Sequence, residues 1–117
     1  MFFSYISSTE QTDIGKKRKR NEDSILRIPV HGVFCVADGM GGGSAGDTAS
    51  NAIIEAIDDV FNTEANKYGN IGLNDKCRLI SEAMNRASAW IYHETQKKGG
   101  GTSGSTIAAL VFDSVSP

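Results

Sequence analysis

The chain has 117 residues, of which 39% are hydrophobic and 22% are charged, and its net charge is -2 at pH 7. One domain at most fits this length, because a folded unit with a core of its own needs roughly 100 to 200 residues. The small net charge provides no general attraction for a polyanion, so we expect no nucleic-acid partner.

The N-terminal segment contains a short apolar stretch, Phe2 to Ser7, whose aromatic and branched residues predict a strand. No basic residues precede it, and it is too short for a signal peptide or a membrane span. We therefore expect a cytoplasmic protein with no membrane contact. The basic run "KKRKR" at Lys16 to Arg20 resembles a nucleic-acid or localisation patch, but acidic residues follow it at once, which favours a solvated strand edge.

A hairpin is predicted next. Ser24 to Ile28 alternate apolar and polar side chains, and His31 to Asp38 form a continuous apolar run. Pro29 to Gly32 between them have the composition of a turn. We expect the second strand to be the more deeply buried.

Two amphipathic helices follow. The first begins near Gly46, is capped by Asp47 or Thr48, and ends before the loop of Asn66 to Gly72. The second is capped by Asn74. Both have apolar residues at steps of three and four, at Ala49, Ala52, Ile53, Ala56, Ile57, Val60 and Phe61 and then at Leu79, Ile80, Ala83, Met84, Ala87, Trp90 and Ile91.

The glycines Gly99 to Gly101 end the second helix, and Ser105 to Phe112 follow as a buried strand. This order of elements indicates an α+β fold with both helices on one face of a sheet. No predicted element covers the other face. We therefore expect residues 1–117 to be an incomplete domain that stops part-way through its fold.

Several residues with reactive or aromatic side chains are expected to be structural. Cys35 and Cys77 are interpreted as small core residues, because their spacing indicates neither a zinc site nor a disulfide. Trp90 is interpreted as a packing residue. His31 in the turn and His93 on the second helix are expected to contact water.

Acidic residues and a glycine are expected to meet at one end of the hairpin. Asp38 closes the buried strand, and Asp23 opens its antiparallel neighbour with Glu22 beside it. Gly39 lets the backbone pass close to an ion, to which its carbonyl adds an oxygen ligand, and such ligands suit Mg²⁺ or Mn²⁺. The pattern is equally compatible with solvated acids at strand ends and a turn that only serves the entrance of the helix.

The glycine cluster after Asp38 does not fit the common nucleotide-binding motifs. The stretch "GMGGGSAGDTAS" lacks the lysine that a P-loop places on phosphates. It contains G-x-G-x-x-G at Gly41, Gly43 and Gly46, but the acidic residue expected about twenty residues later falls within a helix instead of ending a second parallel strand.

Several spaced motifs resemble those of the metal-dependent serine/threonine protein phosphatases of the PPM type, also called type 2C, and most of all their bacterial members. "TDIGKKRKRNEDS" follows the family's D-x-G-x-x-R-x-x-N-E-D order, "VADGMGG" resembles its next motif, and "SGST" at Ser103 to Thr106 resembles a later one. The resemblance covers nearly all of this chain but only about the first half of the family's catalytic domain. It implies part of an α-β-β-α sandwich, in which two antiparallel sheets lie between pairs of helices.

The resemblance also implies a role for each matched residue. Asp38 would bridge two Mn²⁺ or Mg²⁺ ions, Glu22 would bind one of them through its carboxylate, and Gly39 through its carbonyl. Asp23 would support the site by hydrogen bonding, and Arg18 would hold the substrate phosphate. The implied reaction is attack of a metal-activated water on a phosphoserine or phosphothreonine of a protein, without a covalent phosphoenzyme.

The chain departs from the family pattern after Ser103. The family's later S-D-G-like, D-N-like and G-D-S-R-like motifs are absent, and Asp113, the only later acid, is interpreted as a turn residue. Because a two-metal site needs those ligands, we expect little or no phosphatase activity from this chain alone. An exposed sheet face would invite the missing C-terminal half or a complementary chain. The alternative is a short, non-catalytic binding module built on the half-domain.

Overall fold

The computed structural model describes residues 23–41, 45–65 and 71–113, and of Asp23, Glu64 and Ala65 it describes the backbone only. The predicted strand Phe2 to Ser7 and the basic run Lys16 to Arg20 lie outside these residues. So do the predicted site residues Arg18 and Glu22.

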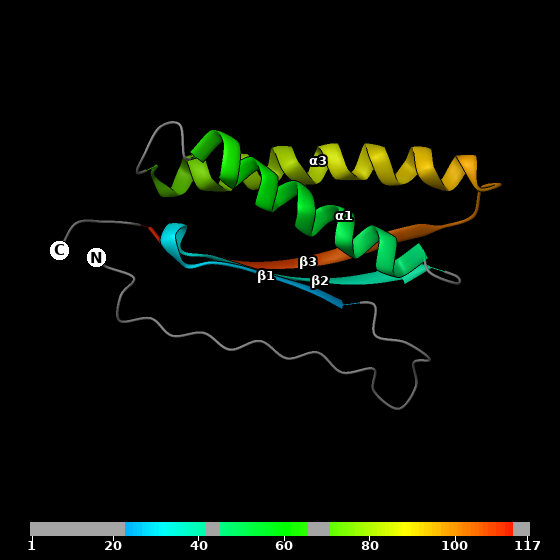
Figure 1. Ribbon diagram of the computed structural model, residues 1–117, viewed down its shortest axis with the longest axis horizontal. Helices are drawn as coiled ribbons and strands as arrows, with labels where there is room; N and C mark the ends of the chain where they lie inside the picture. Colours follow the sequence, from blue (N-terminus) through cyan, green and yellow to red (C-terminus); the bar gives the residue numbers. More distant parts are fainter. Residues whose placement is uncertain (1–22, 42–44, 66–70, 114–117) are drawn as a thin grey trace, which may run out of the picture.

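The described residues form an antiparallel sheet of three strands in the order β1-β2-β3 (Figure 1). The predicted hairpin is confirmed. A short 3₁₀ turn, η2, joins its strands, and Gly32 after it has a φ of 64°, a left-handed conformation that favours glycine. The elements of the sheet are β1 (Asp23–Ile28), η2 (Pro29–His31), β2 (Val33–Gly41) and β3 (Ser103–Val111).

Two long helices, α1 (Ala45–Val60) and α3 (Leu73–Lys97), lie within the described ranges on one side of the sheet, and η3 (Phe61–Ala65) continues α1 as a π-helical turn (Figure 1). Both predicted caps are wrong. Asp47 is in the first turn of α1, and Asn74 is the second residue of α3, whose cap position is Gly72 without a side-chain hydrogen bond. None of the helices in the described part of the chain combines the length and apolar character that crossing a bilayer requires.

The core lies between the sheet and the helices. Val33, Cys35 and Ala37 of β2 are buried because alternate residues of a strand face opposite sides, and these face α1 and α3. Each large aliphatic side chain buried here stabilises the fold by about 1.5 to 3 kcal/mol. The helices and η3 bury Ala49, Ile53, Ile54, Ile57, Val60, Phe61, Leu79, Ile80, Ala83, Ala87 and Ile91.

Three burial predictions are wrong. Trp90 is 47% exposed, and Cys77 is exposed too. The buried side of α3 runs through Ala87 and Ile91, and Trp90 lies off that line because successive helical residues are about 100° apart. Much of β3 is also exposed, because β2 is its only partner among the described strands.

The sheet face opposite the helices carries apolar side chains. Val36 of β2 is 47% exposed and Leu110 of β3 is 58% exposed. Phe34 lies beside Phe112 in an edge contact, with ring centroids 6.0 Å apart. No described element covers this face, as the order of elements predicts.

Candidate metal centre

The start of β1 and the middle of β2 bring two acidic residues to one row of the sheet. Asp23 is the register partner of Asp38 in the antiparallel pair β1·β2. The prediction that the hairpin gathers these residues at one end is therefore confirmed at the level of the backbone.

Asp38 does not end its strand, contrary to the sequence prediction. Strand β2 continues to Gly41, because β3 gives Gly39 and Gly41 the register partners Ser105 and Ser103. Asp38 is half-buried, and it alternates with the buried Ala37 and Gly39. Its side chain therefore belongs to the open face of the sheet, at the end of the apolar surface.

Two motifs that lie far apart in the sequence are adjacent in the sheet. Strand β3 places Thr106 opposite Asp38 and Ser105 opposite Gly39. The Thr106 hydroxyl donates a long hydrogen bond of 3.4 Å to the Asp38 carbonyl. The "SGST" segment thus lies directly beside the "ADGMG" segment.

The glycines of this region are required by close packing between β2 and α1. A Cβ at Gly39 would fall on the carbonyl oxygen of Gly46. A Cβ at Gly41, whose φ is 152°, would lie 2.7 Å from the Cβ of Ala45. The Ser103 hydroxyl donates to the Ala45 carbonyl at 3.1 Å and fastens the start of β3 to the same junction. Side chains at these glycines would displace α1 from the end of the sheet.

Similarity to solved structures supports a family assignment, although no protein-family model and no curated protein matches the sequence. PppA, a key regulatory component of T6SS in Pseudomonas aeruginosa, superimposes with a TM-score of 0.74 at 27% identity over 88% of this chain and 42% of that chain. The serine/threonine phosphatase PstP/Ppp of Mycobacterium tuberculosis gives 0.68 at 26% identity over 89% of this chain and 41% of its own. This chain resembles the PPM-type serine/threonine phosphatases.

Two further structures agree. The PPM phosphatase MsPP of Mycobacterium smegmatis, in complex with cacodylate, has the same fold, with a TM-score of 0.64 at 23% identity over 86% of this chain and 37% of its own. The catalytic domain of PstP in complex with 2 manganese ions gives 0.67 at 27% identity, over 87% and 41% of the two chains. The present chain therefore spans about two fifths of the PPM-type structures that it matches.

The described residues supply only part of the ligand set that the PPM resemblance implies. Among them, no group of three or more His, Cys, Asp or Glu side chains lies close enough to hold a metal ion. Arg18 and Glu22 are outside the described residues, and Asp23 is described by its backbone alone. The carboxylate of Asp38 and the carbonyl of Gly39 have the donor chemistry that a hard divalent cation prefers, but they are fewer than such an ion needs.

A buried serine that the sequence prediction missed connects α1 to the start of β1, next to the paired residues Asp23 and Asp38. Ser50 is fully buried, and its hydroxyl donates to the Asp47 carbonyl at 3.2 Å. Its oxygen also lies 3.1 Å from the hydroxyl of Ser24, which donates to Asn51 Oδ1 at 2.6 Å. Because Ser24 follows Asp23, this network fixes the start of β1 against α1. A serine at a core-facing position of an otherwise apolar helix is the signal that points to it.

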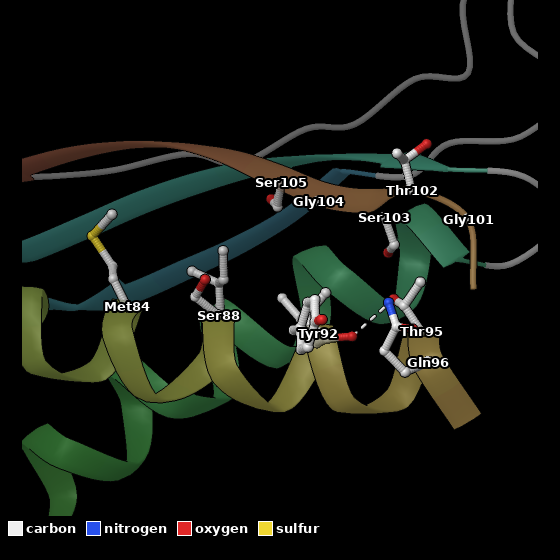
Figure 2. Close-up of a pocket in the computed structure, with 12 residues that line it drawn as sticks. Met84, Ser88, Tyr92, Thr95, Gln96, Gly101, Thr102, Ser103, Gly104 and Ser105 are labelled. Atoms are coloured by element: carbon white, nitrogen blue, oxygen red, sulfur yellow. Dashed lines mark hydrogen bonds between the residues drawn. The ribbon is translucent and has the colours of Figure 1, made fainter. Parts of the chain in front are cut away.

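The groove beside the "SGST" segment lies on the other side of the sheet from Asp38. It has a volume of about 460 Å³, and α3 lines it with Met84, Ser88 and Tyr92 (Figure 2). Ser103 and Ser105 form part of its opposite wall. The groove is therefore separate from the row of Asp38 and Thr106.

Cys35 lies in the core, and His31 packs against it. Burial raises the pKa of the Cys35 thiol to about 11, which excludes a reactive thiolate near neutral pH. His31 is half-buried, with its ring 5.5 Å from that of Phe61, so the expected turn histidine also packs against the core. His93 is exposed, as expected, and Asp113 lies beyond the end of β3.

Proposed function

We propose that residues 1–117 form the N-terminal portion of a metal-dependent phosphatase domain that removes phosphate from phosphoserine and phosphothreonine in proteins. The observation that carries this proposal is the alignment of Asp23, Asp38 and Thr106 in one row of the sheet. Each belongs to a different motif of the PPM resemblance. The fold around them matches serine/threonine phosphatases, one of which is described with 2 manganese ions.

The proposed roles follow from the oxygen and nitrogen groups of the matched residues. Asp38 would bridge two divalent ions, with Glu22 and the Gly39 carbonyl as further ligands. Asp23 would orient the ligands through a hydrogen bond. Two Mn²⁺ or Mg²⁺ ions, when bound, would lower the pKa of a water molecule so that hydroxide is available as the nucleophile near neutral pH.

The chain's own residues would position and neutralise the phosphate. Strand β2 is paired on both sides at Asp38, so the carboxylate is attached to a rigid backbone, as a metal ligand requires. The planar guanidinium of Arg18 would donate two parallel hydrogen bonds to phosphate oxygens, which a lysine does not offer.

The open sheet face supports the proposal that further polypeptide completes this site. Val36 and Leu110 expose apolar surface on the same face as Asp38. The structural neighbours extend well beyond the part that this chain matches. We propose that a C-terminal half, or a complementary chain, covers this face and adds the remaining ligands, and that the isolated chain has little activity.

A Mn²⁺ titration followed by electron paramagnetic resonance tests the metal site without relying on turnover. The 117-residue chain is expected to bind Mn²⁺ weakly, and Asp38→Asn to weaken binding about tenfold or more, because a carboxylate ligand is lost. Asp113→Asn, which removes an acid outside the site, is the matched control. Equal Mn²⁺ affinity in the wild type and Asp38→Asn would contradict the proposed metal site. Mn²⁺-dependent hydrolysis of a phosphothreonine peptide by the 117-residue chain would contradict its expected inactivity.

The second candidate, a non-catalytic binding module, is favoured by the same exposed apolar face. Such a module should fold alone, so its thermal unfolding should be a single cooperative transition. A half-domain that requires its other half should instead melt broadly or aggregate through the exposed face of β2 and β3.

A further inference from the structure

A groove lies between α1 and α3 and includes none of the candidate metal-site residues. Its volume is about 580 Å³, and its lining residues all belong to these two helices. We call it the outer groove. It is lined by Thr48, Asn51, Ala52, Glu55, Ala56, Asp59, Arg86, Ala87 and Trp90.

The floor of the outer groove is made of small side chains. Ala52 and Ala56 are one helical turn apart on α1, and Ala87 faces them from α3. Because alanine side chains are small, the backbone of another helix can approach this floor closely. The lining of α1 from Thr48 to Asp59 covers three turns, roughly 16 Å, which suits a short helix.

The wall of the outer groove contributed by α1 is acidic. Glu55 and Asp59 are exposed and one turn apart, and neither forms an ion pair with any residue that the structure describes. They lie with Asp58 in the last six residues of α1, where the last turn has no basic side chain. Two carboxylates one turn apart on the same face of a helix repel each other. A cationic partner would relieve this repulsion.

An aromatic side chain lies on the opposite wall. Trp90 is 47% exposed although it is a large apolar residue, and it is the chain's single tryptophan. The face of an indole ring attracts lysine and arginine side chains, and the attraction is stronger where the ring is partly desolvated. Arg86 also lines the groove and carries a positive charge. The charged groups of the lining are therefore two carboxylates and one guanidinium.

We propose that the outer groove binds a basic amphipathic helix of a partner protein. Two lysine or arginine side chains one turn apart would meet Glu55 and Asp59. Small residues between them would face Ala52, Ala56 and Ala87, and an alkyl or cationic side chain would cover Trp90. This mode is helix-in-groove recognition, in which residues at helical spacing provide the contacts.

The test uses a synthetic helix of about 15 residues, made of alanine and leucine, with two lysines four residues apart. Its binding to the full 117-residue chain is followed by the fluorescence of Trp90. We expect a saturable change with the lysine peptide and none with a peptide of the same sequence in which glutamate replaces both lysines. Binding should weaken as salt concentration rises, because the pairs are exposed.

Variants of exposed groove residues distinguish recognition from general attraction. The double variant Glu55→Gln, Asp59→Asn should bind the lysine peptide about fivefold more weakly, and Arg86→Gln about twofold more tightly. The double variant Asp75→Asn, Glu82→Gln removes two exposed acids of α3 outside the groove; it is the charge-matched control and should bind like the wild type. Far-UV circular dichroism checks that each variant keeps its helices.

Three results would overturn the proposal. They are no fluorescence change at millimolar lysine peptide, equal binding of the lysine and glutamate peptides, and equal loss of binding in the groove double variant and in Asp75→Asn, Glu82→Gln. The last result would mean that the total negative charge, and not the groove, attracts the peptide.

Discussion

The ammonium group of Lys76 donates a hydrogen bond of 2.8 Å to the carbonyl of Phe112. Lys76 is 1% exposed, so the first turn of α3 holds the residue that follows β3 through a buried contact. The Phe112 amide in turn donates to the Gly32 carbonyl at 2.9 Å. These two hydrogen bonds together fix the position of Phe112 just beyond β3.

Removing the Lys76 ammonium group should destabilise the fold. Lys76→Met keeps most of the aliphatic volume and leaves the Phe112 carbonyl without this donor, which should cost about 1 kcal/mol of unfolding free energy. Lys76→Ala also leaves a cavity and should cost about 3 kcal/mol. Urea denaturation measures both, and equal stability of the two variants would show that the stem of Lys76 contributes no packing.

The contribution of Lys76 should also depend on pH. Burial lowers the pKa of Lys76 in the folded chain, and the nearby charge of Asp113 partly opposes this shift. Above that lowered pKa the unfolded chain binds more protons than the folded one, so stability should increase up to the ordinary lysine pKa of about 10.4. The stability of the wild type relative to Lys76→Met should therefore rise as the pH increases through this window. A constant difference between the two proteins would argue against a buried charged amine.

Gly39 and Gly104 offer a matched pair of alanine substitutions. Gly39→Ala should destabilise the chain by about 3 kcal/mol or more, because its Cβ would fall on the Gly46 carbonyl and push α1 from the sheet. Gly104 has no atom within 4 Å of an added Cβ, so Gly104→Ala should change stability by less than about 1 kcal/mol. Thermal unfolding of both variants provides the comparison. Similar midpoints would mean that the junction of β2 and α1 yields easily.

The two thiols should differ in reactivity. Cys77 is exposed and should react rapidly with a thiol reagent at pH 8. Cys35 is buried, and its pKa of about 11 keeps it protonated at that pH, so it should react only as the chain unfolds. Mass spectrometry of the labelled chain, with Cys77→Ser as the control, gives the two rates. Rapid labelling of Cys77→Ser in native buffer would indicate that β2 is open to solvent.

The sequence allowed the hairpin, both helices and the pairing of Asp23 with Asp38 to be predicted, because alternation and helical spacing are local signals. It did not predict where β2 ends. That boundary depends on β3, which pairs with Gly39 and Gly41 from a distant part of the chain. Strand length is set in this way by tertiary pairing.

The errors at Trp90 and Cys77 have a related cause. An apolar stripe shows that a helix has a buried side, but residue type alone does not fix the edges of that side. Lys76 occupies a buried position that its charge argued against, since its ammonium group reaches a backbone carbonyl. Of the predicted site residues, the structure gives the strand register of Asp23, Asp38 and Gly39. The positions of Arg18 and Glu22 and the roles of all five site residues stay predictions.

The alternation of β2 links the site to the core. Ala37 and Asp38 face opposite sides of the sheet, so a shift of one residue in the pairing of β2 would send the carboxylate into the helix interface and Ala37 out to water. A misregistered chain would therefore lose its core and its acidic row in the same event. The packing of the core and the position of the Asp38 carboxylate therefore depend on one and the same strand register.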